Sequence, residues 1–221
     1  PPPPAAPAAP AAPATASAPA FGAIELRSLR SSVTNKAEDV WQLRHGVDLY
    51  TQLSKSTVQQ LKPQVDHCIE VQLIENSLVD ALIHTGLATS AAENVEGCRS
   101  ALAKAFNGTL NLNVTTQRVN QQKRGPFTAG IRRLYGSGSG SGSGTSRCLR
   151  VLTLEQLARQ GRAQNLVDDG TWARIEKTVA VAFDSVGPVA RQSLPESGRQ
   201  SEICDDTLER LQDALVKLGV L

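Results

Sequence analysis

Cysteine is the residue type whose chemistry this sequence points to most directly. The chain of 221 residues holds four cysteines, at Cys68, Cys98, Cys148 and Cys204. An even number of cysteines is typical of disulfide-stabilised proteins from oxidising compartments. The alternative is a set of reduced thiols in a cytosolic core, because free cysteine is among the most buried residue types. We expect two disulfides.

The spacing of the expected helices limits which cysteines can pair. If Cys68 and Cys98 lie on two limbs of a helical hairpin that turns near Ala88, their heights along the limbs differ by about 15 Å at about 1.5 Å per residue. That separation exceeds the reach of a disulfide. Cys68–Cys98 is therefore disfavoured, and with it Cys148–Cys204 if all four cysteines are paired. Either remaining connectivity joins parts of the chain on both sides of a Gly/Ser-rich segment.

Two triplets of the N-x-[ST] type mark Asn107 and Asn113 as acceptors for N-linked glycans. Both lie in a polar stretch after an expected helix, which we interpret as surface. Together with the even number of cysteines and a proline-rich arm, they favour a secreted or cell-surface protein. We therefore predict glycosylation at both asparagines.

The histidines His45, His67 and His84 are too widely spaced to predict a zinc site, which uses closely spaced His or Cys ligands. Neither Cys68 nor Cys98 stands at a spacing from a histidine that supports nucleophilic catalysis. These residue types are therefore better explained by structural roles. We expect no metal at these residues.

Two pairs of carboxylates, Asp168-Asp169 and Asp205-Asp206, stand where helices are expected to begin. Aspartate is a preferred capping residue there, because its side chain accepts a hydrogen bond from a free backbone amide. Capping is thus favoured over acid–base chemistry or calcium binding. The sequence also lacks phosphate-binding loops and the G-x-S-x-G motif. We expect a protein that is not an enzyme and needs no cofactor.

Lys123-Arg124 precedes Gly125-Pro126 and could be a dibasic processing site in a secreted precursor. The alternative is an exposed basic loop. Net charge gives little further guidance, since it is only +2 and acidic and basic residues are mixed along the chain. Nucleic-acid binding would require a concentrated basic face, so we expect no nucleic-acid partner.

Composition divides the chain into four regions. Residues 1–20 are almost all proline and alanine, which predicts a solvated flexible arm. Residues 21–135 form a helical first part, and residues 146–221 form a helical second part that packs on the first as one domain. Between them, at 136–145, glycine and serine alternate strictly, which is typical of an engineered flexible linker. The absence of methionine indicates that the natural start is missing.

The elements expected to position these residues are mainly helices. Apolar residues recur every three or four positions from Lys36 to Leu61 and again after Pro63 as far as His84, which predicts a long amphipathic rod kinked at the proline. A third helix ends at Phe106. Alternation between 109 and 118 predicts a short extended segment. Two further helices are expected, one around 172–186 and one beginning at Asp205 or Asp206.

The sequence therefore predicts an all-α fold, an elongated bundle of about four main helices. No apolar run is long enough to span a bilayer, although the native protein could be surface-anchored. We expect an extracellular ectodomain that binds a protein or other macromolecule through segment 109–135 or the replaced loop. An intracellular scaffold with reduced cysteines is the first alternative, and a disulfide-stapled helical enzyme inhibitor is the second.

Overall fold

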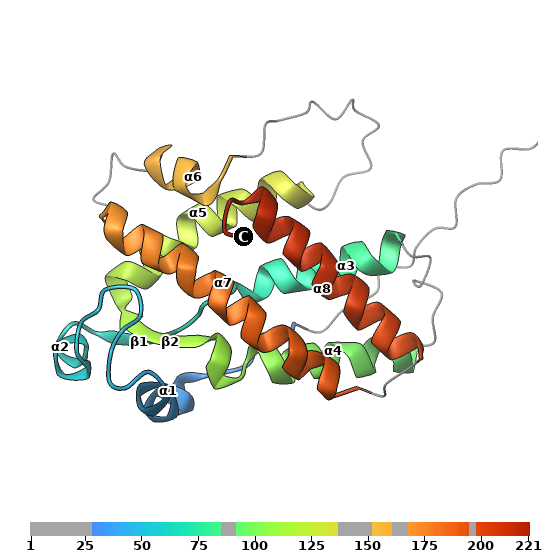
Figure 1. Ribbon diagram of the computed structural model, residues 1–221, viewed down its shortest axis with the longest axis horizontal. Coiled ribbons are helices and arrows are strands. Elements are labelled where there is room, and N and C mark those ends of the chain that lie inside the picture. The colour runs from blue at the N-terminus through green and yellow to red at the C-terminus, as the bar shows by residue number, and fades with distance from the viewer. Residues whose placement is uncertain (1–27, 85–91, 137–151, 161–167, 195–197) are drawn as a thin grey trace, which may run out of the picture.

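The structure is a computed structural model that describes residues 28–84, 92–136, 152–160, 168–194 and 198–221 (Figure 1). The expected Pro/Ala arm, the Gly/Ser linker beyond Gly136 and Cys148 lie outside these residues. The described chain is mostly helical with one small sheet, which supports the predicted all-α class. None of the described helices is long and apolar enough to cross a membrane.

The described chain begins with short helices, and its two strands lie on either side of α3 and α4 in the sequence. In order they are η1 Thr34–Lys36, α1 Ala37–Leu43, α2 Lys55–Gln60, β1 Pro63–His67, α3 Val71–His84, α4 Ala92–Phe106, η3 Thr109–Asn111, β2 Leu112–Thr116, α5 Gln117–Tyr135, α6 Leu154–Gln160, α7 Asp169–Gln192 and α8 Arg199–Lys217.

The last two helices form a layer over the middle of the chain. In Figure 1, α7 and α8 run in front of α3, α4 and α5, and they pack against α3 and α4. Leucines on one face of α8 reach the main core, as the three-and-four spacing of Leu208, Leu211, Leu215 and Leu218 predicts. A smaller core lies under α1 and α2, where Trp41 and Val58 pack against Leu112 and Val114 of β2.

The predicted long kinked rod is wrong. Its first limb is two short helices, α1 and α2, separated by a loop in which His45 and Gly46 have positive φ angles of 54° and 73°. A left-handed residue cannot continue a helix, and Gly46 adopts that conformation without steric cost. Past Lys62, which also has positive φ, the second limb begins as the strand β1 rather than as a helix.

The two strands form an antiparallel pair in which Pro63 faces Thr116 and His67 faces Leu112. Pro63 is tolerated because the flanking bonds, Gln117 N–H to Lys62 O and Cys68 N–H to Asn111 O, place its missing N–H on the side away from β2. The predicted extended segment near 109–118 is confirmed as β2. Its partner was not expected, because the three-and-four spacing after Pro63 suggested a helix.

Helix α5 occupies a region for which the sequence analysis predicted no long helix and allowed an exposed basic loop at Lys123-Arg124. It runs for 19 residues and contains Pro126. The Thr116 hydroxyl caps its start by accepting a hydrogen bond from Val119 N–H. Gly130 lets α5 approach the C-terminal end, since a Cβ there would lie 2.6 Å from Leu218 Cδ2. Tertiary packing therefore outweighs the helix-breaking residues of this segment.

The paired carboxylates differ in their positions on the helices. Asp168 caps α7 as predicted, accepting hydrogen bonds from Thr171 N–H and Oγ1, both at 2.8 Å. Asp205 and Asp206 lie inside α8, which begins at Arg199, so the prediction that they cap the last helix is wrong. They pair instead with Arg191 at 2.7 Å and Arg210 at 2.9 Å.

Candidate functional site

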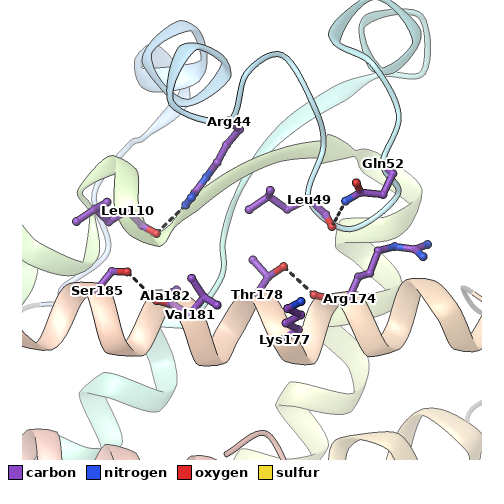
Figure 2. A pocket seen from close by; sticks show the side chains of 10 residues that line it. All are labelled: Arg44, Leu49, Gln52, Leu110, Arg174, Lys177, Thr178, Val181, Ala182 and Ser185. Carbon is purple, nitrogen blue, oxygen red and sulfur yellow. Dashed lines mark hydrogen bonds between the residues drawn. The ribbon is translucent and has the colours of Figure 1, made fainter.

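The candidate site is a groove of about 460 Å³ between α7 and the loop that follows α1 (Figure 2). One wall is a single face of α7, where residues spaced by three or four positions point toward the loop. The opposite wall comes from the loop and from η3. We call this surface the α7 groove; its lining is Arg44, Leu49, Gln52, Leu110, Arg174, Lys177, Thr178, Val181, Ala182 and Ser185.

The α7 groove combines positive charge with apolar surface. Arg44, Arg174 and Lys177 line it, and no aspartate or glutamate does. Arg174 also acts on the Asp168 carboxylate at the start of α7, since its charge contributes to lowering the pKa of Asp168. The Arg44 and Arg174 side chains donate to carbonyl oxygens, at 2.9 Å to Leu110 O and 2.6 Å to Tyr50 O, which fixes their charges without cancelling them. Beside them Val181 is 52% exposed.

The loop wall is held in place by a fully buried carboxylate. Asp48 accepts hydrogen bonds from Tyr50 N–H, Thr51 Oγ1, Asn113 Nδ2 and Thr115 Oγ1 at 2.5 to 3.0 Å. These donors are all neutral, and two of them belong to β2. The buried charge is thereby solvated by fixed dipoles, and the loop is attached to the sheet.

A second polar cluster lies in the core around Lys123 of α5. The ammonium is fully buried and contacts Asp66 Oδ2 at 2.8 Å, Glu70 Oε1 at 2.9 Å and the His67 carbonyl. Tyr50 Oη donates to Asp66 Oδ2 at 2.9 Å. A buried charge without partners would be strongly unfavourable, so this arrangement attaches α5 to β1 and to the start of α3.

Electrostatics in the Lys123 cluster reflect two carboxylates sharing one ammonium. Burial raises the pKa of Asp66 to about 6, although the Lys123 charge acts in the opposite direction. Burial acts on Glu70 in the same sense, but Lys123 outweighs it and the pKa of Glu70 is lowered. For Lys123, burial is outweighed by both carboxylates, which raise its pKa. Glu70 lines a described cavity of about 220 Å³ at the surface, but Lys123 and Asp66 line none of the described cavities. The ion pairs of Lys123 are therefore better explained by a structural role than by catalysis.

The glycosylation sites predicted at Asn107 and Asn113 are not at the surface. Asn113 is fully buried, and its Nδ2 donates to Asp48 at 2.7 Å. Asn107 is 5% exposed, and its Nδ2 donates to the carbonyls of Leu29 and Ala103. A glycan on either nitrogen would break these bonds and could not fit in the core. The folded chain is therefore incompatible with both predicted glycans.

The residues of the predicted processing site also lie within a folded element. Lys123 is buried in α5, and the exposed Arg124 follows it on the same helix. A protease needs an extended, accessible chain, so the folded protein does not present this pair for cleavage. The burial of Lys123 cannot be inferred from its neighbours in the sequence, because its partners Asp66 and Glu70 are distant along the chain.

The structure describes three of the four cysteines that were predicted to form disulfides. Cys68, Cys98 and Cys204 are buried free thiols. Cys68 lies beside Tyr50 and Lys123, and burial raises its pKa to about 11. Cys98 and Cys204 are brought together between α4 and α8, where their side chains hydrogen-bond to each other. No disulfide joins any two of these three cysteines, although Cys98 and Cys204 are in contact.

The histidines have three separate environments. His67 Nε2 lies 2.9 Å from Asn107 Oδ1, and burial lowers its pKa. His84 pairs with Asp80 at 3.1 Å on α3, and His45 lies in the loop after α1. Within the described residues, histidine, cysteine and carboxylate side chains form no group that could hold a metal ion.

Comparison with known proteins gives no further guidance to the site. No protein-family model, curated protein or solved structure matches the chain.

The sequence analysis did not identify the α7 groove, although part of its signal was present. Arg174, Lys177, Val181 and Ser185 recur at helical spacing on α7, beside its buried face of Ile175, Val179 and Val186. Such a stripe would ordinarily be read as a solvated face. What makes it a groove is the loop around Leu49, whose position depends on the buried contacts of Asp48.

Proposed function

We propose that this chain is a non-catalytic helical domain that binds a macromolecular partner, and that the α7 groove binds an acidic segment of a partner protein. The observation that carries the proposal is the set of three cations, Arg44, Arg174 and Lys177, in a groove with no carboxylate. Complementary charge on the partner would neutralise them and guide association.

The apolar part of the groove adds to this specificity. Leu49 and Leu110 line it beside the exposed Val181. A segment that alternates acidic and apolar side chains would satisfy both the charges and the apolar surface. The groove is open to solvent along α7, which suits an extended or helical peptide better than an enclosed small molecule.

We further propose an extracellular or cell-surface location, in keeping with the even number of cysteines and the contact between Cys98 and Cys204. Glycosylation is no longer part of the argument, because both sequon asparagines are buried. The alternative is an intracellular scaffold, which the unpaired buried thiols favour. A thiol titration of the protein from its native source distinguishes the two locations.

The test is a binding titration of fluorescent peptides of alternating glutamate and leucine against a matched glutamine–leucine peptide. We expect only the acidic peptide to bind, with affinity that falls as salt rises. Lys177→Glu should weaken binding of the acidic peptide by about tenfold, or about 1.4 kcal/mol. The matched control is Lys217→Glu, because Lys217 is also exposed but lies on α8 outside the groove.

A second pair of variants tests the apolar contact. Val181 and Val216 are 52% and 51% exposed, but only Val181 lines the groove. Val181→Asp should reduce peptide binding, whereas Val216→Asp should leave it unchanged. Equal affinity for acidic and neutral peptides, or equal effects of the paired variants, would contradict the proposal.

A further inference from the structure

Cys98 and Cys204 lie face to face between two helices that come from opposite sides of the Gly/Ser segment. Both residues have no exposed surface, and their thiols are in hydrogen-bonding contact. Helices α4 and α8 approach closely here: a Cβ on Gly97 would lie 2.5 Å from the side chain of Gln200, one turn before Cys204. Two cysteines whose side chains touch between packed helices are candidates for a disulfide, which needs their Cα atoms within about 7 Å.

We infer that Cys98 and Cys204 form a redox-dependent disulfide that joins α4 covalently to α8. The inference goes beyond the proposed binding function, since neither cysteine lines the α7 groove. It also selects one of the pairings that the sequence left open. The inference does not require Cys68 and Cys148 to form a second disulfide. Cys68 lies beside Tyr50 and Lys123, and no described cysteine is next to it.

The reaction is a thiol–disulfide exchange with a low-molecular-weight disulfide such as oxidised glutathione. The thiolate of one cysteine attacks one sulfur of the oxidant, which forms a mixed disulfide and releases one glutathione thiol. The other cysteine then attacks the protein sulfur of the mixed disulfide, which forms the protein disulfide and releases the second glutathione. The protein loses two hydrogens, and the oxidant is reduced to two thiols that carry the two protons.

The two thiols share one hydrogen bond, which couples their protonation. The thiolate is the reactive form, so the first step requires one of the two thiols to lose its proton. Both residues lie in the second turn of their helices, near Gly198 and Ala92, so opening of a helix end is enough to admit the oxidant.

The experiment is peptide mapping of the full chain after incubation with oxidised or reduced glutathione. Unreacted thiols are first alkylated under denaturing conditions, and trypsin and a glutamyl endopeptidase then cut without reduction. Cleavage at Glu96, Arg99, Glu202 and Glu209 releases the peptides 97–99 and 203–209, and cleavage at Glu70 separates Cys68 from Cys98. We expect one cross-linked product of 97–99 with 203–209 after oxidation, and both cysteines alkylated after reduction.

Three variants make the assignment specific. Cys98→Ser and Cys204→Ser should each abolish the cross-link, whereas Cys68→Ser, which removes another buried thiol, should leave it intact. Thermal unfolding provides a second readout: oxidation should raise the Tm of the unsubstituted protein and of Cys68→Ser only. Alkylation of both cysteines after oxidation, or cross-linking of either one to Cys148 or Cys68, would overturn the inference.

Discussion

At the scale of single residues, Lys123 shows how strongly the core depends on one charge. Its ammonium is surrounded by Asp66, Glu70 and the His67 carbonyl, and it lies 5.1 Å from the centre of the Phe127 ring. The aromatic face and the two carboxylates compensate for the loss of water. A lysine that lies in a polar stretch of the sequence is thus the centre of a buried ionic cluster.

Replacing Lys123 by methionine should be strongly destabilising. Lys123→Met keeps a long aliphatic side chain but leaves Asp66 and Glu70 buried without their counter-ion, which should cost about 3–5 kcal/mol. Urea unfolding monitored by circular dichroism measures the loss. The control is Arg124→Met on the exposed side of the same helix, which should change stability by less than about 0.5 kcal/mol. Similar losses for the two variants would contradict a central role for Lys123.

Asp66 predicts a distinct dependence of stability on pH. Its folded pKa, about 6, is above its ordinary value of 3.8, so the folded state binds this proton more tightly. The resulting stabilisation is fully present below 3.8 and is lost as pH rises through about 6. Asp66→Asn stays neutral over this range, so its stability penalty should be smaller at about pH 7.5 than at about pH 5. Equal penalties in urea titrations at the two values would contradict this prediction.

At the scale of elements, α7 continues through a proline, beyond the range of about 172–186 that the sequence predicted for this helix. Gly187-Pro188 lies within Asp169–Gln192, where Val186 and Ala190 on either side are fully buried. The apolar face of α7 therefore keeps the helix in place despite the missing amide donor. This result differs from Pro63, where the proline begins a strand.

The two prolines should accordingly respond differently to alanine. Pro188→Ala restores an amide that can donate to the Asp184 carbonyl four residues earlier, and it removes a ring clash in an exposed position of α7. We expect a gain of about 1 kcal/mol and a rise in Tm of about 2–4 °C. Pro63→Ala should give no gain, because its nitrogen faces away from β2. Calorimetry measures the Tm of both variants. A lower Tm for Pro188→Ala than for the unsubstituted protein would contradict this prediction.

At the scale of the whole molecule, the main core is shared by both sides of the Gly/Ser segment. Leu78 of α3 and Leu102 of α4 belong to the same cluster as Val179 of α7 and Leu211 of α8. An ion pair between Asp80 and Arg210 at 2.8 Å joins α3 to α8 as well. Neither side can bury its apolar face alone, so covalent continuity between them contributes less than this packing.

Cutting the chain within residues 137–144 should therefore leave the two parts associated. We expect a protein with a protease site inserted there to elute as one species after cleavage, even in reductant, and to separate into two bands only on a denaturing gel. The buried leucines of α8 supply most of the attraction, and Leu211→Asp should release the fragments. Elution of the cleaved chain as two separate species would show that the linker holds the parts together.

The sequence by itself determined the helical class, the strand at 112–116, the Asp168 cap and the buried face of the last helix. Each of these depends on near neighbours: the period of apolar residues or a side chain that bonds to its own backbone turn. Such information is present in any stretch of a few turns.

Only the tertiary structure decided that Pro63–His67 pairs with Leu112–Thr116, that Lys123 and both sequon asparagines are buried, and that Cys98 meets Cys204. The α7 groove belongs to this group too, because the Asp48 contacts hold its loop wall against β2. In each case the deciding partner is distant along the chain. Burial and pairing are properties of three-dimensional neighbours, and local periodicity does not contain them.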